Sequence, residues 1–175
     1  MSILAIVLIV LAIAIAAVLL IAASKSDRFE MKRSASINVP SDRVLPLIND
    51  LRAQVRWSPF EKDPNMKRVY SGPAQGTGAV YEWDGNREVG AGRIAITESS
   101  PSVVRMNLQM TRPFACNNEV EFTLQPNGQG TDVTWAMRGT QPFFMKVMSI
   151  FVDCEKMVRT QFDQGLAKLK ALAEA

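Results

Sequence analysis

The chain opens with an uninterrupted apolar segment, Ile3–Ala23, of 21 residues without a Pro, a Gly or a polar side chain. A helix of that length rises ~1.5 Å per residue, so it is about 31 Å long and matches the hydrocarbon core of a bilayer. Its Ile, Val, Leu and Ala leave no polar face, which favours a helix that crosses the membrane over one that lies on it. We therefore predict a transmembrane anchor over residues 1–24, with a cleaved signal peptide as the alternative.

After Ser24 the pattern changes to an alternation of apolar and polar positions, which is typical of strands that bury one face. Residues 25–28 are a short polar linker, and residues 29–175 are expected to form one globular domain. The strands expected from alternation and turn residues are 29–39, 66–71, 78–83, 90–99, 103–110, 118–125 and 131–138.

Two helical patterns interrupt and close this run of strands. Pro40 ends the first strand, and Ser41 is the expected N-cap of a short helix that reaches Leu51. A long helix is expected over residues 142–173, about 45 Å in length. At 100° per residue its apolar stripe contains Phe144, Val147, Met148, Phe151, Val158, Phe162, Leu166 and Leu169. This order predicts an α+β fold in which a curved antiparallel sheet of about seven strands packs around a C-terminal helix.

The amino-acid composition excludes several kinds of catalytic and metal site. The chain has no histidine, which excludes the usual Ser-His-Asp and Cys-His nucleophilic sites, histidine general bases and His-containing metal or haem sites. Its 2 cysteines, Cys116 and Cys154, are too few for a Cys-only zinc site or an iron–sulfur cluster. We therefore expect no metal and no cofactor, and a reaction would have to use carboxylates, Tyr or Lys. The redox state of the two cysteines is left open.

Charge bears on location and partners. With Lys+Arg 20 and Asp+Glu 17 the net charge is +3, and no long basic run indicates nucleic-acid binding. No Lys or Arg precedes the apolar segment, whereas Lys25, Arg28, Lys32 and Arg33 follow it. The positive-inside tendency then places the domain in the cytoplasm. An extracytoplasmic domain stays open, because Asp27 and Glu30 are interspersed among these cations. Protein partners are not indicated.

Glu155 is the candidate for chemistry. On the predicted long helix it lies within about 20° of Phe144 and Phe162, in the middle of the apolar stripe. A carboxylate that faces the sheet would need a cation or a raised pKa, so it could orient a ligand or act as an acid or base. The alternatives are a structural pair with an Arg and a stripe that opens to solvent at this point.

Aromatic and methionine side chains are the candidates for a hydrophobic ligand site. With Glu155, the expected lining is Trp57, Tyr81, Trp83, Met106, Met110, Phe122, Trp135, Met137, Met148 and Phe151. Ordinary core packing is the alternative for each of them. Glu82 and Asp84, beside Trp83, are a candidate acidic pair, and their place on one strand face favours solvated surface. The apolar loop edges 112–114 and 141–144 are expected to anchor loops, to form a ligand entrance or to touch a bilayer.

The domain resembles the START and birch-pollen-allergen superfamily, also called SRPBCC, and within it the bacterial polyketide cyclase/dehydrase and lipid transport branch. The resemblance runs over residues 29–175. It is carried by the joint order of Ser34-Ala35-Ser36-Ile37, Trp57-Ser58-Pro59-Phe60, Asp63-Pro64, Tyr70-Ser71-Gly72-Pro73, Gly76-Thr77-Gly78-Ala79, Tyr81-Glu82-Trp83-Asp84-Gly85-Asn86, Gly130-Thr131, Val133-Thr134-Trp135, Phe162 and Gly165-Leu166.

The resemblance implies a helix-grip fold with an apolar cavity between sheet and helix, and a location at the bacterial inner membrane. Members bind lipids, sterols, polyketides or hormones, and a minority catalyse cyclisation or dehydration. No fixed catalytic motif carries over to positions of this sequence. We therefore expect a membrane-anchored protein that binds a hydrophobic small molecule or lipid. The alternatives are a cyclase or dehydrase that uses a cavity carboxylate, and an interaction module with a filled core.

Overall fold

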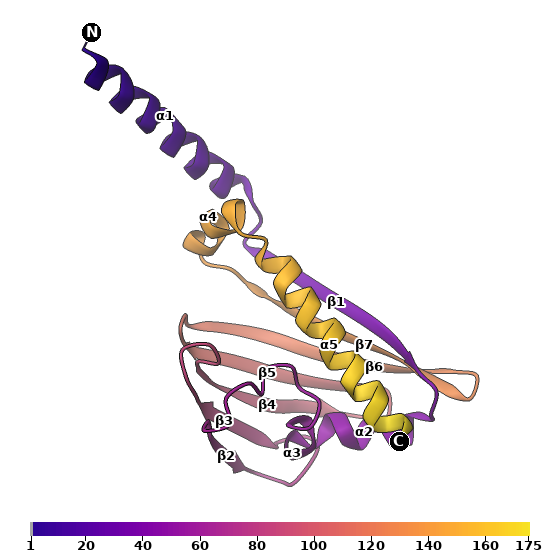
Figure 1. The fold of residues 1–175 in the computed structure, drawn as a ribbon. Coiled ribbons are helices and arrows are strands. Elements are labelled where there is room, and N and C mark those ends of the chain that lie inside the picture. The colour runs from indigo at the N-terminus through magenta and orange to yellow at the C-terminus, as the bar shows by residue number, and fades with distance from the viewer. Residues whose placement is uncertain (1) are drawn as a thin grey trace.

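The computed structural model describes residues 2–175, except for the side chain of Cys154. Seven strands form one antiparallel sheet in the order β1-β7-β6-β5-β4-β3-β2 (Figure 1). The strands are β1 Arg28–Ile37, β2 Lys67–Ser71, β3 Val80–Asp84, β4 Ala91–Ser99, β5 Val103–Arg112, β6 Cys116–Asn127 and β7 Gly130–Thr140. Strands β2 to β7 lie side by side in chain order, and β1 pairs with β7 at the edge opposite β2.

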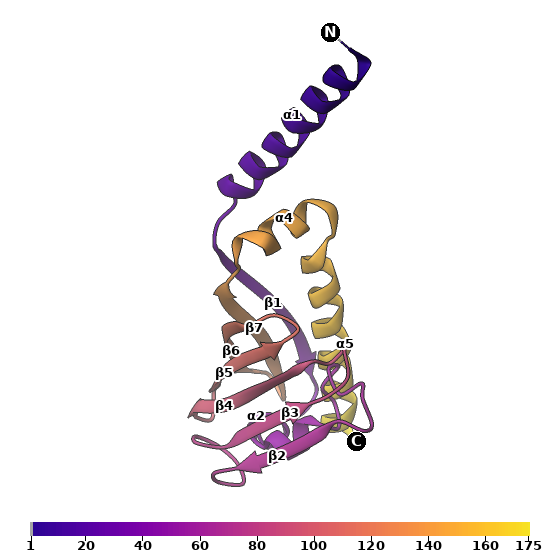
Figure 2. The same ribbon diagram turned by 90° about the vertical axis from the view of Figure 1, so that its left-hand side faces the viewer.

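Helices cover one face of this sheet. The short helices α2, Ser41–Asn49, and α3, Leu51–Gln54, connect β1 to β2, and the long helix α5, Cys154–Glu174, crosses the same face (Figures 1 and 2). The buried positions of α5 recur at helical spacing, at Phe162, Leu166 and Leu169. The predicted α+β helix-grip fold is therefore confirmed.

The alternation along β5 and β6 explains why the sheet has a dry face and a wet face. Met106 and Phe122 point to the helix side and are buried. On the other face Arg105 donates a hydrogen bond from Nε to Glu121 Oε2 at 2.7 Å, and Arg138 pairs with the same carboxylate. The hydrogen bond from Arg105 is the main cause that lowers the pKa of Glu121. These cross-strand ion pairs fit a face that stays in water.

The C-terminal helix differs from the prediction, because it is two helices. Helix α4, Phe143–Phe151, ends at Val152, whose backbone is extended, and α5 begins after Asp153. Asp153 caps the new helix, with Oδ1 accepting from the backbone N–H of Lys156 at 2.8 Å. A continuous stripe from Phe144 to Leu169 is therefore wrong. A smaller difference is that Pro40 takes the N-cap position of α2, so Ser41 is its first helical residue.

A glycine sets the approach of α5 to the sheet. A Cβ on Gly165 would lie 2.7 Å from the indole carbon Cζ3 of Trp135 and 3.0 Å from Cδ of Pro59. The absent side chain lets the helix backbone lie directly on these two rings. One turn earlier, Phe162 stacks on Trp135 with 4.1 Å between the ring centroids.

Helix α1, Ile3–Ser24, stands away from the sheet, and almost all of its side chains are exposed (Figure 1). By length and composition it can cross a membrane. Its buried residue is Ala22, at the end that meets α4. Figure 2 shows α4 lying crosswise between the lower end of α1 and the sheet.

Candidate ligand-binding cavity

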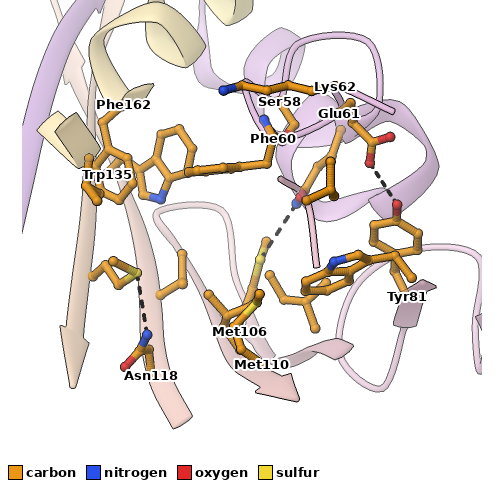
Figure 3. Close-up of a pocket in the computed structure, with 18 of the residues that line it drawn as sticks. Ser58, Phe60, Glu61, Lys62, Tyr81, Met106, Met110, Asn118, Trp135 and Phe162 are labelled. Atoms are coloured by element: carbon orange, nitrogen blue, oxygen red, sulfur yellow. Dashed lines mark hydrogen bonds between the residues drawn. The ribbon is translucent and has the colours of Figure 1, made fainter. Parts of the chain in front are cut away.

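The sheet, α5 and the loop between α3 and β2 line a partly open cavity of about 340 Å³ (Figure 3). It is lined by Gln54, Trp57, Ser58, Phe60, Glu61, Lys62, Met66, Tyr81, Trp83, Glu88, Val89, Ile94, Met106, Leu108, Met110, Asn118, Val120, Phe122, Trp135, Met137, Val158 and Phe162. Most of these side chains are apolar. The volume lies at the lower end of the ~300–1,000 Å³ that is usual for small-molecule sites.

Aromatic rings form the inner end of the cavity. Trp57 packs edge-on against Phe122 and Trp135, with ring centroids 5.9 and 5.7 Å apart. Its indole Nε1 donates a hydrogen bond to the carbonyl oxygen of Leu47 at 2.8 Å, which fixes the ring to α2. Phe162 closes the stack from α5. This end is rigid, because each ring is held by neighbours on two or more elements.

A polar cluster centred on Glu61 lies at one side of the cavity (Figure 3). Tyr81 donates a hydrogen bond from its hydroxyl to Glu61 Oε1 at 2.8 Å, and Arg68 donates to Oε2 from Nη2 at 2.7 Å and from Nε at 3.0 Å. Burial raises the pKa of the Tyr81 hydroxyl, and the hydrogen bond to Glu61 raises it further. Tyr81 therefore keeps its proton at neutral pH.

Two buried polar atoms in the lining have no hydrogen-bond partner among the described residues. They are the indole Nε1 of Trp135 and the amide Oδ1 of Asn118. An unpartnered buried polar atom costs about 1–3 kcal/mol. Asn118 Oδ1 is turned toward Gly139 of β7, so the Trp135 indole is the position that favours a complementary group from a ligand.

The rim of the cavity lies where β5 ends and β6 begins. Lys62 and Glu88 are exposed there and form an ion pair, with Nζ and Oε1 2.9 Å apart. Phe60 is also exposed, and Met110 and Val158 are half-buried at this end. The same end of the sheet carries the start of β1 and the end of β7, and so it faces α1 and α4 (Figure 2).

The structure brings eight of the predicted lining residues together around this cavity: Trp57, Tyr81, Trp83, Met106, Met110, Phe122, Trp135 and Met137. Contact between these eight and a ligand stays a prediction. Met148, Phe151 and Glu155 lie outside the cavity. Met148 and Phe151 are exposed on α4. The reason is the break at Val152 and Asp153. Because of it, the side chains of α4 do not continue the spacing of those on α5 that face the sheet.

Glu155 requires a correction. It is exposed in the first turn of α5 and forms an ion pair with Arg159 one turn later. The expectation that this carboxylate faces the sheet is wrong, and the alternatives of an Arg pair and a solvent-facing position describe it. Glu82 and Asp84 are likewise exposed, paired with Arg93 and Arg112.

Replacing Glu155 by Gln is expected to leave both ligand binding and the unfolding midpoint unchanged, because an exposed i,i+4 ion pair contributes little. Denaturant titration of the full chain and the labelling assay described below provide the two measurements. A loss of labelling in Glu155→Gln would contradict the placement of this residue outside the cavity.

Sequence reasoning missed Glu61, Lys62 and Glu88. They lie in loops, where no periodicity assigns a side chain to a face. A usable signal was present, because the Trp57-Ser58-Pro59-Phe60 and Asp63-Pro64 stretches flank Glu61 and Lys62 directly. Asp63 is buried and accepts a hydrogen bond from the backbone N–H of Asn86 at 2.8 Å. It thereby ties this loop to the turn between β3 and β4.

Comparisons with known proteins agree with the fold. A KanY protein solved by NMR covers 86% of this chain and 100% of its own at 17% identity, with a TM-score of 0.63. The crystal structure of protein CV1439 from Chromobacterium violaceum covers 85% and 98% at 17% identity, with a TM-score of 0.58. That of Ara h 8.0201 covers 83% and 97% at 10% identity, with the same TM-score. No curated protein matches this sequence.

At these identities the structures show a shared fold and nothing about ligands. The family evidence comes from the sequence itself. The family model described as "Polyketide cyclase / dehydrase and lipid transport" matches residues 28–174, which is most of the chain. The match covers every strand, α2 to α5 and the whole cavity. The chain therefore belongs to the polyketide cyclase/dehydrase and lipid transport family.

Proposed function

We propose that this protein binds one compact, largely apolar molecule in the cavity and is held at a membrane by α1. The observation that carries the proposal is the cavity of about 340 Å³ with its mostly apolar lining. Transfer of an apolar ligand from water into such a site is favourable in proportion to the area it buries. A phospholipid with two acyl chains is several times larger than this volume, so the size supports a small molecule or single-chain lipid.

The polar groups of the lining support a ligand that carries at least one oxygen. Trp135 Nε1 is a buried donor without a partner among the described residues. The Glu61 and Tyr81 pair adds a second polar position on the opposite wall. A flat or ring-shaped apolar skeleton with a carbonyl or hydroxyl group would suit both the aromatic inner end and these atoms.

The membrane part of the proposal has its own support. Helix α1 has the length and composition of a span, and cations follow it at Lys25, Arg28, Lys32 and Arg33. Their position favours a cytoplasmic domain, and the family resemblance supports the inner membrane of a bacterium as the location. An anchor would keep the cavity beside the phase in which apolar molecules concentrate.

The second candidate is an enzyme of the cyclase or dehydrase type, and Glu61 is the observation that favours it. This carboxylate lines the cavity. Both of its oxygens already accept hydrogen bonds from Tyr81 and Arg68, which favours a role in orienting the ligand over proton transfer. Turnover of a bound polyketide-like substrate that stops in Glu61→Gln would favour the enzyme instead.

Filling the cavity with a larger side chain tests the binding proposal. Leu108 points into the cavity, and Gln109, the next residue of β5, is exposed on the wet face. In Leu108→Trp the added ring occupies ligand space, so the affinity is expected to fall about tenfold or more, which corresponds to about 1.4 kcal/mol or more of binding free energy. Gln109→Trp adds the same ring outside the cavity and is expected to bind as the wild type does.

The measurement is photo-crosslinking of the full chain in nanodiscs with a neutral naphthyl diazirine, followed by peptide mapping. Saturable adducts on peptides of β5, β6 and β7 report the cavity, and adducts on α1 report lipid. We expect the cavity adducts to disappear in Leu108→Trp and to persist in Gln109→Trp, with unchanged circular dichroism in both. Equal cavity labelling in the two variants would contradict the proposal.

A further inference from the structure

Helix α4 has its polar side inside and its apolar side outside. Lys146 is only 5% exposed, although lysine is almost never buried in globular proteins without a partner. On the opposite side of the helix, Phe144, Met148 and Phe151 are exposed, Phe151 by 68%. At 100° per residue these three lie within about 60° of each other, so they form one continuous apolar face. A helix that faces water on this side would be expected to show the reverse arrangement.

The inward polar groups are held by the segment that leaves α1. Lys146 Nζ donates to Asp27 Oδ1 at 2.5 Å and to the carbonyl oxygen of Lys25 at 3.1 Å. Lys25 Nζ in turn donates to Ser149 Oγ at 2.8 Å. These bonds fix α4 at the end of α1 and fix which side of α4 turns outward.

The outward side continues onto a neighbouring loop. Phe114, between β5 and β6, is exposed and packs against Phe144 with ring centroids 4.8 Å apart. Phe143 and Val152 are also exposed. We define the α4 apolar face as Phe114, Phe143, Phe144, Met148, Phe151 and Val152. Grouped exposed apolar side chains of this kind mark a site of interaction on a soluble surface.

We propose that the α4 apolar face inserts into the surface of the bilayer that α1 crosses. The inference rests on the proposed anchoring by α1. The position of α4 supports insertion independently. The helix lies crosswise at the end of α1, where a membrane span leaves the hydrocarbon core (Figure 2). Phe and Met side chains on a short helix in the interface plane have the chemistry of interfacial insertion.

Insertion has a consequence for the cavity. Phe114 follows Met110, a residue of the cavity rim, by four positions and touches α4 directly. With α4 seated in the headgroup region, the rim lies next to lipid, and an apolar ligand can pass between bilayer and cavity without crossing bulk water.

The test places a tryptophan on the α4 apolar face. The full chain is reconstituted in phosphatidylcholine vesicles whose acyl chains are brominated close to the headgroup, because bromine quenches indole emission at short range. The added emission of Phe151→Trp, taken as the difference from the wild type, is expected to shift to the blue and to lose about half its intensity or more, because interfacial helices bury ~5–10 Å deep. Gln129→Trp is the matched control, because Gln129 is exposed in the turn between β6 and β7 at the opposite end of the sheet, and its added emission stays red-shifted and unquenched.

The outcomes separate the two proposals. If the chain fails to float with the vesicles, the anchoring by α1 is wrong, and the insertion fails with it. If it floats and the Phe151→Trp emission is red-shifted and unquenched, the anchor stands and the insertion is wrong. A blue-shifted but unquenched emission would indicate burial against protein, such as a second copy, and would also overturn the insertion. Ligand binding in the cavity is tested separately, by the comparison of Leu108→Trp with Gln109→Trp.

Discussion

Replacing Trp57 by Ala is expected to destabilise the domain by about 3–5 kcal/mol, the range for removal of a large buried aromatic side chain. Trp57 is 1% exposed and packs against Phe122 and Trp135 at the inner end of the cavity. Its removal would enlarge an existing cavity without a compensating collapse, because the rings around it are held from several elements. It would also leave the carbonyl oxygen of Leu47 without its donor.

Denaturant unfolding of the full chain in detergent micelles, followed by circular dichroism, measures this effect. Trp57→Phe is the matched variant, since it keeps most of the ring and loses the hydrogen bond, and it is expected to cost about 1–2 kcal/mol. If Trp57→Ala loses less free energy of unfolding than Trp57→Phe does, this ring is not part of the structural core.

Between pH 10 and pH 12 the free energy of unfolding is expected to fall by up to about 1.4 kcal/mol per pH unit more in the wild type than in Tyr81→Phe. Burial, and then the hydrogen bond to Glu61, raises the pKa of Tyr81 above its value in the unfolded chain. Above pH ~10 the unfolded chain therefore releases a proton that the folded chain keeps. The stabilisation from Tyr81 is complete below that pH and is lost as the pH rises toward the folded pKa.

Unfolding curves of both proteins at intervals from pH 8 to pH 12 provide the comparison. Tyr70, whose pKa burial also raises, is present in both and cancels. Parallel pH profiles for the wild type and Tyr81→Phe would mean that the Tyr81 hydroxyl ionises as easily in the folded protein as in the unfolded one, and would contradict its buried placement beside Glu61.

The sheet was predictable because its information is local and repeated. In β6, for example, Val120, Phe122 and Leu124 alternate with Glu119, Glu121 and Thr123, and each apolar residue is buried in the structure. A period-two pattern over several residues assigns each side chain to a face without knowledge of its partners. The same pattern placed Met106, Phe122 and Trp135 on the inner face of the sheet, although it could not separate cavity lining from solid core.

The end of the chain was less predictable, because one short interruption changes every later position. The predicted apolar stripe assumed one continuous helix over residues 142–173. Because the helix breaks at Val152 and Asp153, Glu155 faces solvent and Phe151 lies away from the sheet. Asp is a preferred N-cap and a poor residue inside helices, so Asp153 was a signal of the break that the assumption of one continuous helix passed over. Glu61 and Lys146 were missed for a different reason: their roles depend on contacts with Tyr81 and Asp27, which are distant in sequence.

Native mass spectrometry of the full chain, released from its own membranes and compared with Leu108→Trp and Gln109→Trp, shows whether the cavity of the membrane-bound protein holds a compact apolar molecule. We predict one adduct of small-molecule mass on the wild type and on Gln109→Trp, and none on Leu108→Trp. A chain without an adduct in all three proteins, or the same adduct on all three, would contradict the claim.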